Sequence, residues 1–244
     1  MKITQLKEPN KQLEEEFFDF FAHSKPYDLG NLRSPHLKRK KIQKLYDSYC
    51  EECHIYIVEE DSKIKTAAFL KEFPSFLDVI FIFGVTKHFN SADIMSGVHA
   101  IFDIAIKNHN KNYIKSEIRR KHKVSSYKKW IERYDKRAII FNDPQNTVVW
   151  CKSNRMKAKF KVVGTNKTTK HLMEKEGSLK RTYFKPSSQG QGNMRELVFE
   201  DGIYLFDEKS VDFLPHCVLV HGFLSDNKEN VGRIALEFVP QNEK

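Results

Sequence analysis

Cysteine and histidine side chains, which can bind metals or act as nucleophiles, lie close together at two places in the sequence. Residues 50–54 read Cys-Glu-Glu-Cys-His, which is the spacing of half a zinc site. His216 and His221 flank Cys217 and could assist a thiolate nucleophile. A second ligand pair at finger-like spacing does not follow residues 50–54, and no third group is evident that would orient a histidine near Cys217. We therefore expect the four cysteines to be free thiols, as in a reducing compartment, and expect no metal site.

The chain is strongly basic, with a net charge of +10 from 42 Lys and Arg against 32 Asp and Glu. Lysines cluster at residues 38–44, 119–123 and 152–170. Such a balance favours polyanions, namely nucleic acid, an acidic protein surface or the phosphates of coenzyme A, without choosing among them. Each cluster is equally typical of a solvated face. Arginine is scarce and the aromatic residues lie in apolar runs, so any DNA contact through the basic clusters is expected to be non-specific.

The composition is that of a globular protein, with 40% hydrophobic residues in 244. No apolar run reaches eighteen residues, so we expect no membrane span. Residues 1–10 lack the basic-then-apolar pattern of a signal peptide. We expect a protein made inside a cell and not secreted by such a peptide.

The first part of the chain alternates strand and helix patterns. Residues 1–6 predict a short edge strand, and Asn10 then caps a helix over residues 11–24. Turn-rich residues 25–35 precede a second helix over residues 36–49. Three strands follow, over residues 54–59, 63–72 and 77–85. The last of these is apolar enough to be buried on both faces.

A long helix, capped by Ser91 or Asp93 and running to about His109, comes next. It is followed by a strand over residues 113–118, a helix over 124–134, and a hairpin of strands over 137–142 and 147–152. Because a helical crossover joins residues 77–85 to residues 113–118, these two strands are predicted to be adjacent and parallel.

This order of elements over residues 1–153 resembles the GNAT superfamily of acyl-CoA N-acyltransferases. The resemblance implies an α/β domain with a mixed sheet flanked by helices. In that family the loop into the central helix is glycine-rich, and its N–H groups hold the cofactor pyrophosphate. Here the matching residues 86–95 contain no glycine, and Asp93 adds a negative charge. The positions that the resemblance assigns to cofactor binding are Val85, Lys87, Asn90 and Ser91.

The family also carries a tyrosine in the helix after the fifth strand, which protonates the departing thiolate. Trp130 falls nearest that position, and Tyr127 and Tyr134 lie one turn away. Either tyrosine could donate a proton, although both are also typical of core-facing aromatics. The positional candidates for a general base are Glu72, Asp78 and His88.

These departures suggest comparison with divergent GNAT-like proteins of tailed bacteriophages, which also lack the glycine loop. Some of them accompany the virion or its assembly. The richness of this chain in lysine, asparagine and isoleucine is typical of an AT-rich genome. The comparison implies an intracellular or virion-associated location.

Residues 154–244 lie outside the resemblance. Residues 154–195 are basic and punctuated by Gly and Ser, which predicts a connecting arm with at most one short helix. Residues 196–244 alternate polar and apolar side chains, which predicts three or four short strands in a β-rich region. The apolar positions there need a second core or a neighbouring protein. We therefore expect residues 154–244 to contact other protein subunits.

Two functions of different classes follow. The first is a catalytically degenerate GNAT-fold protein that serves as a structural or assembly component, such as that of a phage virion, and needs no cofactor. The alternative is an active N-acyltransferase that uses acetyl-CoA and holds its phosphates with lysines instead of a glycine loop.

Overall fold

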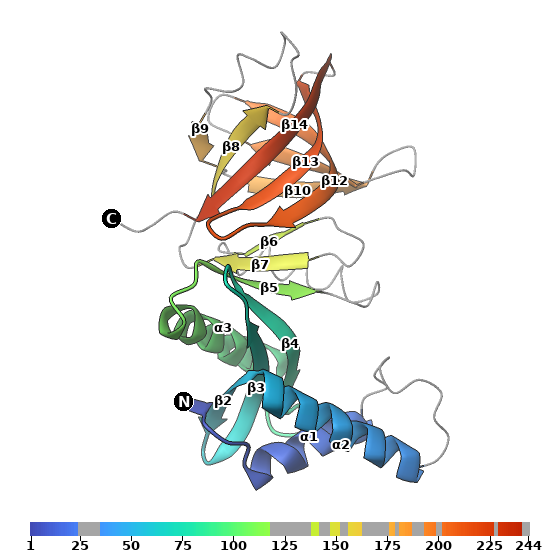
Figure 1. Ribbon diagram of the computed structural model, residues 1–244, viewed down its shortest axis with the longest axis vertical. Helices are drawn as coiled ribbons and strands as arrows, with labels where there is room; N and C mark the ends of the chain where they lie inside the picture. The colour runs from blue at the N-terminus through green and yellow to red at the C-terminus, as the bar shows by residue number, and fades with distance from the viewer. Residues whose placement is uncertain are drawn as a thin grey trace. The chain divides into compact units, whose positions relative to one another are not determined.

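The computed structural model describes residues 1–23, 35–117, 138–141, 147–151, 156–162, 176–178, 181–186, 193–198, 202–226 and 229–240 (Figure 1). The chain divides into two compact units. One contains Met1–Phe73 and Leu77–Asn110, and the other contains Pro74–Phe76 and Lys111–Lys244. The fold class is α/β with a β-rich C-terminal region, as predicted.

The first unit has an antiparallel sheet in the order β1 (Lys2–Leu6), β2 (His54–Glu60), β3 (Lys63–Glu72) and β4 (Leu77–Gly84). Asp61 and Ser62, at φ 50° and 60°, form the turn between β2 and β3, and this left-handed pair matches the twist of a two-residue hairpin. All four strands lie where the sequence predicts them. The predicted parallel pairing of β4 with residues 113–118 joins the two units and stays a prediction.

The expected burial of β4 on both faces is wrong. Most of its residues are only partly buried, and Leu77 and Phe83 alone in this strand are buried. The reason is that the helix on one face of the sheet, α3 (Ser91–Asn108), packs chiefly over β2 and β3.

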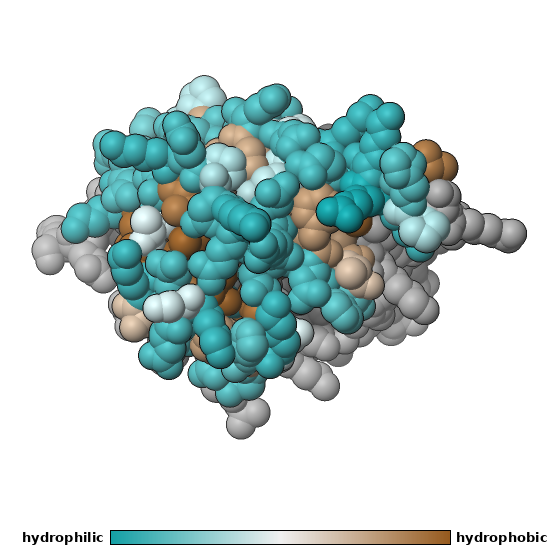
Figure 2. Space-filling model, turned by 90° about the horizontal axis from the view of Figure 1, so that it is seen from below, coloured by the Kyte–Doolittle hydropathy of each residue, from teal (hydrophilic) through white to brown (hydrophobic). Residues whose placement is uncertain are grey.

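Two helices, α1 (Lys11–His23) and α2 (Pro35–Glu52), cover the other face of this sheet. Phe17 of α1 is fully buried at the centre of their aromatic core, with ring centroids 4.8 Å from Phe21 and 5.0 Å from Tyr46. Asn10 caps α1 as predicted, because its Oδ1 accepts the Leu13 N–H at 2.8 Å. The view in Figure 2 is mostly hydrophilic, with apolar side chains visible between the polar ones.

Helix α3 approaches the sheet very closely. A Cβ atom on Gly97 would lie 2.7 Å from Thr66 Cγ2, and one on Gly84 would lie 2.3 Å from Ile94 Cγ2. Asn90 caps α3, and its side chain accepts the Asp93 N–H. The prediction that Ser91 or Asp93 is the cap is wrong. The Asn90 backbone is extended, as a capping residue requires, and Ser91 and Asp93 already lie inside the helix.

In the second unit β5 (Tyr113–Glu117), β7 (Thr147–Cys151) and β6 (Ala138–Ile140) are antiparallel neighbours in that order. A second sheet has the order β10-β11-β12-β13-β14-β8-β9 and is antiparallel throughout. Its strands are β8 (Met156–Val162), β9 (Glu176–Ser178), β10 (Arg181–Pro186), β11 (Asn193–Val198), β12 (Ile203–Phe213), β13 (Val218–Asp226) and β14 (Glu229–Pro240).

The stretch predicted as a connecting arm contributes strands to this sheet. Residues 156–162 alternate Met, Ala, Phe and Val with three lysines, which is the period of a strand. The interpretation as an arm gave weight to the lysines and glycines and overlooked this alternation. β8 pairs with β14 in seven-residue register, from Met156 with Pro240 to Val162 with Ile234.

One core joins residues on both sides of the domain boundary predicted at residue 153. Tyr113, Phe141 and Val149 are buried in the same cluster as Phe206 and Phe238. The boundary of the compact units, after Asn110, therefore differs from the predicted one. The apolar positions expected to need a core are mostly buried here, namely Leu197, Val218, Val220, Ile234 and Phe238, whereas Ile203 is exposed.

A buried ion pair ties parts of this core together. The side chains of Arg195 in β11 and Glu208 in β12 are both fully buried and hydrogen-bonded to each other. Arg195 also donates to the carbonyl oxygen of Ile140 in β6, and its guanidinium lies 5.2 Å from the centre of the Phe141 ring. Losing either partner of such a pair leaves a buried charge uncompensated. The bond from Arg195 to Ile140 links the two sets of strands within the second unit.

The close approach of α3 predicts the opposite of the usual effect of a Gly→Ala change in a helix. Gly97→Ala should destabilise the protein by about 1–3 kcal/mol because the new methyl group displaces Thr66, whereas the change normally stabilises a helix interior by about 1 kcal/mol. Ser96→Ala, at the exposed neighbouring position, should be neutral or slightly stabilising. Denaturant unfolding measures both.

Thr66→Ser should rescue the variant, since it removes Cγ2 and keeps the hydroxyl that donates to the Phe83 carbonyl at 2.7 Å. A Gly97→Ala protein as stable as the Ser96→Ala control would show that α3 does not lie this close to β3.

Candidate functional site

The connection from β4 to α3, where the resemblance places the cofactor phosphates, is closed by its own hydrogen bonds. The Val85 N–H donates to the Lys65 carbonyl at 3.0 Å. The Val85 carbonyl accepts the N–H groups of His88 at 3.4 Å and Phe89 at 3.3 Å. The N–H groups of His88 and Phe89 are therefore bonded inside the loop. A glycine-rich loop would leave such groups facing outward.

One amide in the first turn of α3 is occupied in the same way. Asn90 Oδ1 accepts the Asp93 N–H at 2.9 Å, and the Asn90 carbonyl accepts the Ile94 N–H at 3.0 Å. A helix N-terminus binds anions through amides that have no partner inside the protein. Here the cap satisfies one of them, and the carboxylate of Asp93 in the first turn repels an anion.

Two lysines adjoin this connection, and each is paired with carboxylates. Lys87 Nζ lies 2.9 Å from Glu16 Oε2 and 3.1 Å from Asp19 Oδ2, both in α1. The hydrogen bond with Glu16 is the main cause that raises the pKa of Lys87 above its usual value. Lys65 Nζ is 2.6 Å from Glu60 Oε2 and 5.4 Å from the centre of the Phe89 ring.

The residues predicted to act together fall in two places. Val85 is buried, while Lys87, His88, Asn90 and Ser91 are exposed in the connection and the first turn of α3. Glu72 pairs with Leu77 at the start of β4, whereas the connection follows the end of that strand. Glu72 and His88 are therefore separated by the length of β4. Tyr127 and Tyr134 lie outside the described residues.

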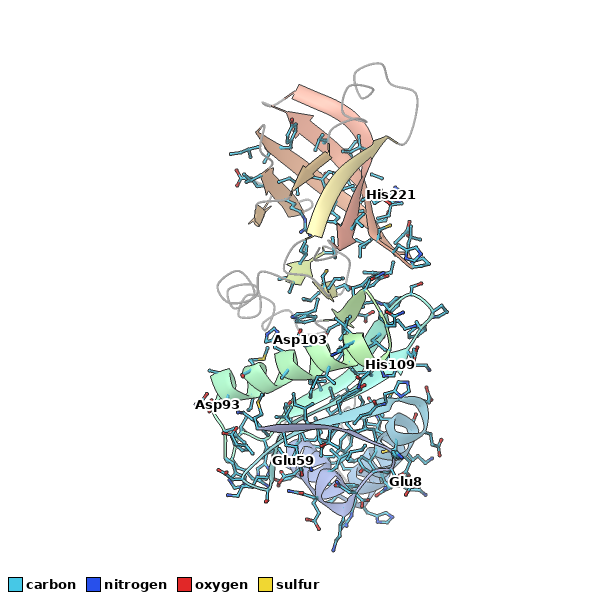
Figure 3. The ribbon with its side chains drawn as sticks, turned by 90° about the vertical axis from the view of Figure 1, so that its left-hand side faces the viewer. Glu8, Glu59, Asp93, Asp103, His109 and His221 are labelled. Atoms are coloured by element: carbon cyan, nitrogen blue, oxygen red, sulfur yellow. The ribbon has the colours of Figure 1, made fainter. Side chains whose placement is uncertain are left out.

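Glu72 meets two histidines at the other end of α3. Its Oε2 atom lies 3.2 Å from His54 Nε2 and 2.8 Å from His109 Nδ1. His54 begins β2, Glu72 ends β3, and His109 is the C-cap of α3. Figure 3 shows His109 and Asp93 at opposite ends of this helix. The two imidazole rings are 4.2 Å apart between their centres.

The hydroxyl of the buried Tyr56 contacts the ring nitrogen of His109 that does not face Glu72. Tyr56 OH lies 3.1 Å from His109 Nε2, donates to Gln5 Oε1 at 2.9 Å and accepts from Asn108 Nδ2 at 3.4 Å. Burial is the main cause that raises the pKa of Tyr56, so the hydroxyl keeps its proton at neutral pH.

Sequence reasoning found Glu72 alone and missed its partners. His54 was read together with the nearby cysteines, and His109 only as a helix end. One signal was available, because a strand beginning at His54 and its hairpin partner ending at Glu72 bring these residues to the same end of the sheet. His109 joins them only through the packing of α3, which no local motif reveals.

The cysteines lie in a different setting. Burial is the main cause that raises the pKa of the Cys50 and Cys53 thiols to about 11. Cys217 is buried, and His221 pairs instead with Asp212, at 3.1 Å between Nε2 and Oδ2. The structure therefore gives no support to a thiolate nucleophile at either place.

No protein-family model matches the sequence, and no curated protein matches it. Among solved structures, the chain is similar to an acetyltransferase from Streptococcus agalactiae at 15% identity and a TM-score of 0.42, covering 62% of this chain and 97% of that one. It is similar to the Campylobacter jejuni N-acetyltransferase PseH in complex with acetyl coenzyme A (12%, 0.44, 62% and 99%). A third is the PaiA N-acetyltransferase of Thermoplasma acidophilum in complex with coenzyme A (11%, 0.43, 63% and 100%).

Within the described ranges, no helix is long and apolar enough to cross a membrane.

The raised thiol pKa values predict slow alkylation of Cys50 and Cys53 in the native protein. At pH 8 a thiol with a pKa of about 11 is almost entirely protonated, so iodoacetamide should label these two residues more than about 100-fold more slowly than free cysteine. Labelling should accelerate as the pH approaches 11. Peptide mass spectrometry over time measures the rate, with the denatured chain at the same pH as the control. Equal rates in the native and denatured chains would contradict the prediction.

Proposed function

We propose that this protein is a non-catalytic member of the acyltransferase-like folds and serves as a structural or assembly component. The observation that carries this proposal is the closure of the β4–α3 connection. The N–H groups of His88, Phe89, Asp93 and Ile94 have partners within the connection or the helix itself. A pyrophosphate would find these four N–H groups already bonded within the protein.

The charges at the connection support the same function. Lys87 is the cation best placed to meet a phosphate, yet it is held by two carboxylates of α1. A phosphate would compete with Glu16 and Asp19 for Lys87 while facing Asp93. The Glu16 side chain is mostly buried, with 15% of it exposed. Moving it away from Lys87 would therefore cost free energy.

The second unit supports an assembly role. Its seven-stranded sheet ends in β9 on one side and β10 on the other, and each of these is paired on only one side in the described part of the chain. An edge strand presents backbone N–H and C=O groups that a neighbouring chain can pair with. The lysines of residues 157–161 and the basic residues Arg181 and Lys185 add attraction to an acidic partner.

The alternative is an acyl-CoA-dependent N-acyltransferase, and one observation favours it. Glu72, a positional candidate for the general base, lies beside two histidines and is partly exposed. This arrangement is suited to proton transfer. The arrangement around Glu72 supplies no site for the cofactor, so the acyltransferase is the second candidate.

Acetyl-CoA should bind the full-length protein no more tightly than millimolar. Isothermal titration calorimetry measures this, with Lys87→Met as the matched variant. The proposal predicts no saturable heat for either protein, since Lys87 is already paired. Micromolar binding to the wild type that Lys87→Met weakens would establish the acyltransferase alternative instead.

The assembly role is tested separately on the intact chain, because the shared core makes a truncation at residue 153 unsuitable. Cross-linking mass spectrometry of the protein in its native particle, such as a purified virion, should link lysines of residues 154–244 to other subunits. Cross-links confined to the chain itself would contradict it.

A further inference from the structure

We propose that His54, Glu72 and His109 form a binding site for a zinc ion at the C-terminal end of α3. Their donor atoms, His54 Nε2, Glu72 Oε2 and His109 Nδ1, lie within 4.8 Å of one another. Glu72 Oε2 is 3.2 Å from the first nitrogen and 2.8 Å from the second. Zinc bonds of about 2.0–2.2 Å in a tetrahedron place neighbouring donors roughly 3.3 Å apart. Small side-chain movements therefore suffice to bring all three donors onto one ion.

The donor set suits zinc among the divalent ions. Two imidazoles and one carboxylate are ligands that Zn²⁺ binds in tetrahedral sites, whereas Mg²⁺ and Ca²⁺ prefer oxygen ligands alone. The His54 and Glu72 side chains are each 39% exposed and His109 is 10% exposed. The ion can enter from the solvent side, and three protein ligands leave a fourth position for water or a substrate atom.

The hydrogen bonds behind His109 place its Nδ1 atom towards Glu72. The Tyr56 hydroxyl donates its proton to Gln5 and lies 3.1 Å from His109 Nε2, the other ring nitrogen. Nδ1 faces the Glu72 carboxylate at 2.8 Å. A metal ion between these two atoms would bond to both, and His54 Nε2, which converges on the same carboxylate oxygen, supplies a third donor.

The cluster also has the support that metal sites need. Metal-bound histidines commonly donate their other N–H to an orienting partner, and Tyr56 takes that part here. His54 and Glu72 belong to paired strands, with His54 opposite Leu70. His109 is held by its own backbone N–H, which donates to the Ala105 carbonyl at 3.0 Å. An ion at this place would link the end of α3 to β2 and β3.

This site differs from the one that the sequence spacing indicates. The sequence groups His54 with Cys50 and Cys53, whereas the group of metal-binding donors found among the described residues contains neither thiol. The double variant Cys50→Ser/Cys53→Ser therefore separates the two possibilities.

Zinc binding is tested by titrating ZnCl₂ into the untagged, chelator-treated full-length protein in a calorimeter. We expect one ion per chain. Glu72→Gln and His54→Ala should weaken binding more than the roughly 10- to 100-fold caused by loss of an orienting partner. The controls are His88→Ala, which removes an exposed histidine elsewhere in the same unit, and the cysteine double variant, and both should bind as the wild type does.

Tyr56→Phe tests the orienting hydroxyl and should weaken binding roughly 10- to 100-fold. The Co²⁺-substituted protein should show a tetrahedral visible spectrum without the charge-transfer band of a cobalt–thiolate bond. Circular dichroism checks that each variant is folded, and His54→Ala, at a partly exposed strand end, is the variant expected to fold most readily. Absence of saturable zinc binding, unchanged affinity in Glu72→Gln, or loss of binding in the cysteine variant would each overturn the proposal. None of these outcomes depends on whether acetyl-CoA binds.

Discussion

The close approach of α3 to β3 and β4 is the constraint on which the first unit depends. Gly97 against Thr66 and Gly84 against Ile94 leave no room for a Cβ atom, so the helix has little freedom to shift or rotate on the sheet. Its N-terminus is then fixed where Asn90 can cap it, directly after the β4 connection. Its C-terminus is fixed where His109 reaches Glu72. The positions of the groups at both ends therefore follow from the packing of α3 on the sheet.

The two ends of α3 differ in the groups that they offer to a ligand. At the N-terminal end, the His88, Phe89 and Asp93 N–H groups and Lys87 already have partners within the protein, and the first turn carries a carboxylate. At the C-terminal end, the Glu72 carboxylate and two imidazoles converge, and the Tyr56 hydroxyl lies within hydrogen-bond distance of His109. The two ends of α3 therefore present different groups to a ligand.

Local patterns predicted much of the first unit. Helical spacing of apolar residues located α1 and α2, and the Asn10 cap marked the start of α1. Alternation located β2, and β3 was predicted as its hairpin partner. The predicted cap of α3, Ser91 or Asp93, lies one or three residues past Asn90, because all three are favourable capping types. Strand β8 was missed because its lysines resembled a solvated arm, although apolar residues alternate with them over all seven positions. The cluster around Glu72 needed three separate elements and their packing, which periodicity does not encode.

The central claim is that the β4–α3 connection is closed to a pyrophosphate, and amide NMR tests it residue by residue. Coenzyme A is added in excess to the ¹⁵N-labelled full-length protein, and the amide resonances of His88, Phe89, Asp93 and Ile94 are followed. Because these four groups already donate within the connection and the first turn of α3, their resonances are expected to stay in place. Saturable shifts of these four amides would contradict the account and identify the connection as a phosphate site.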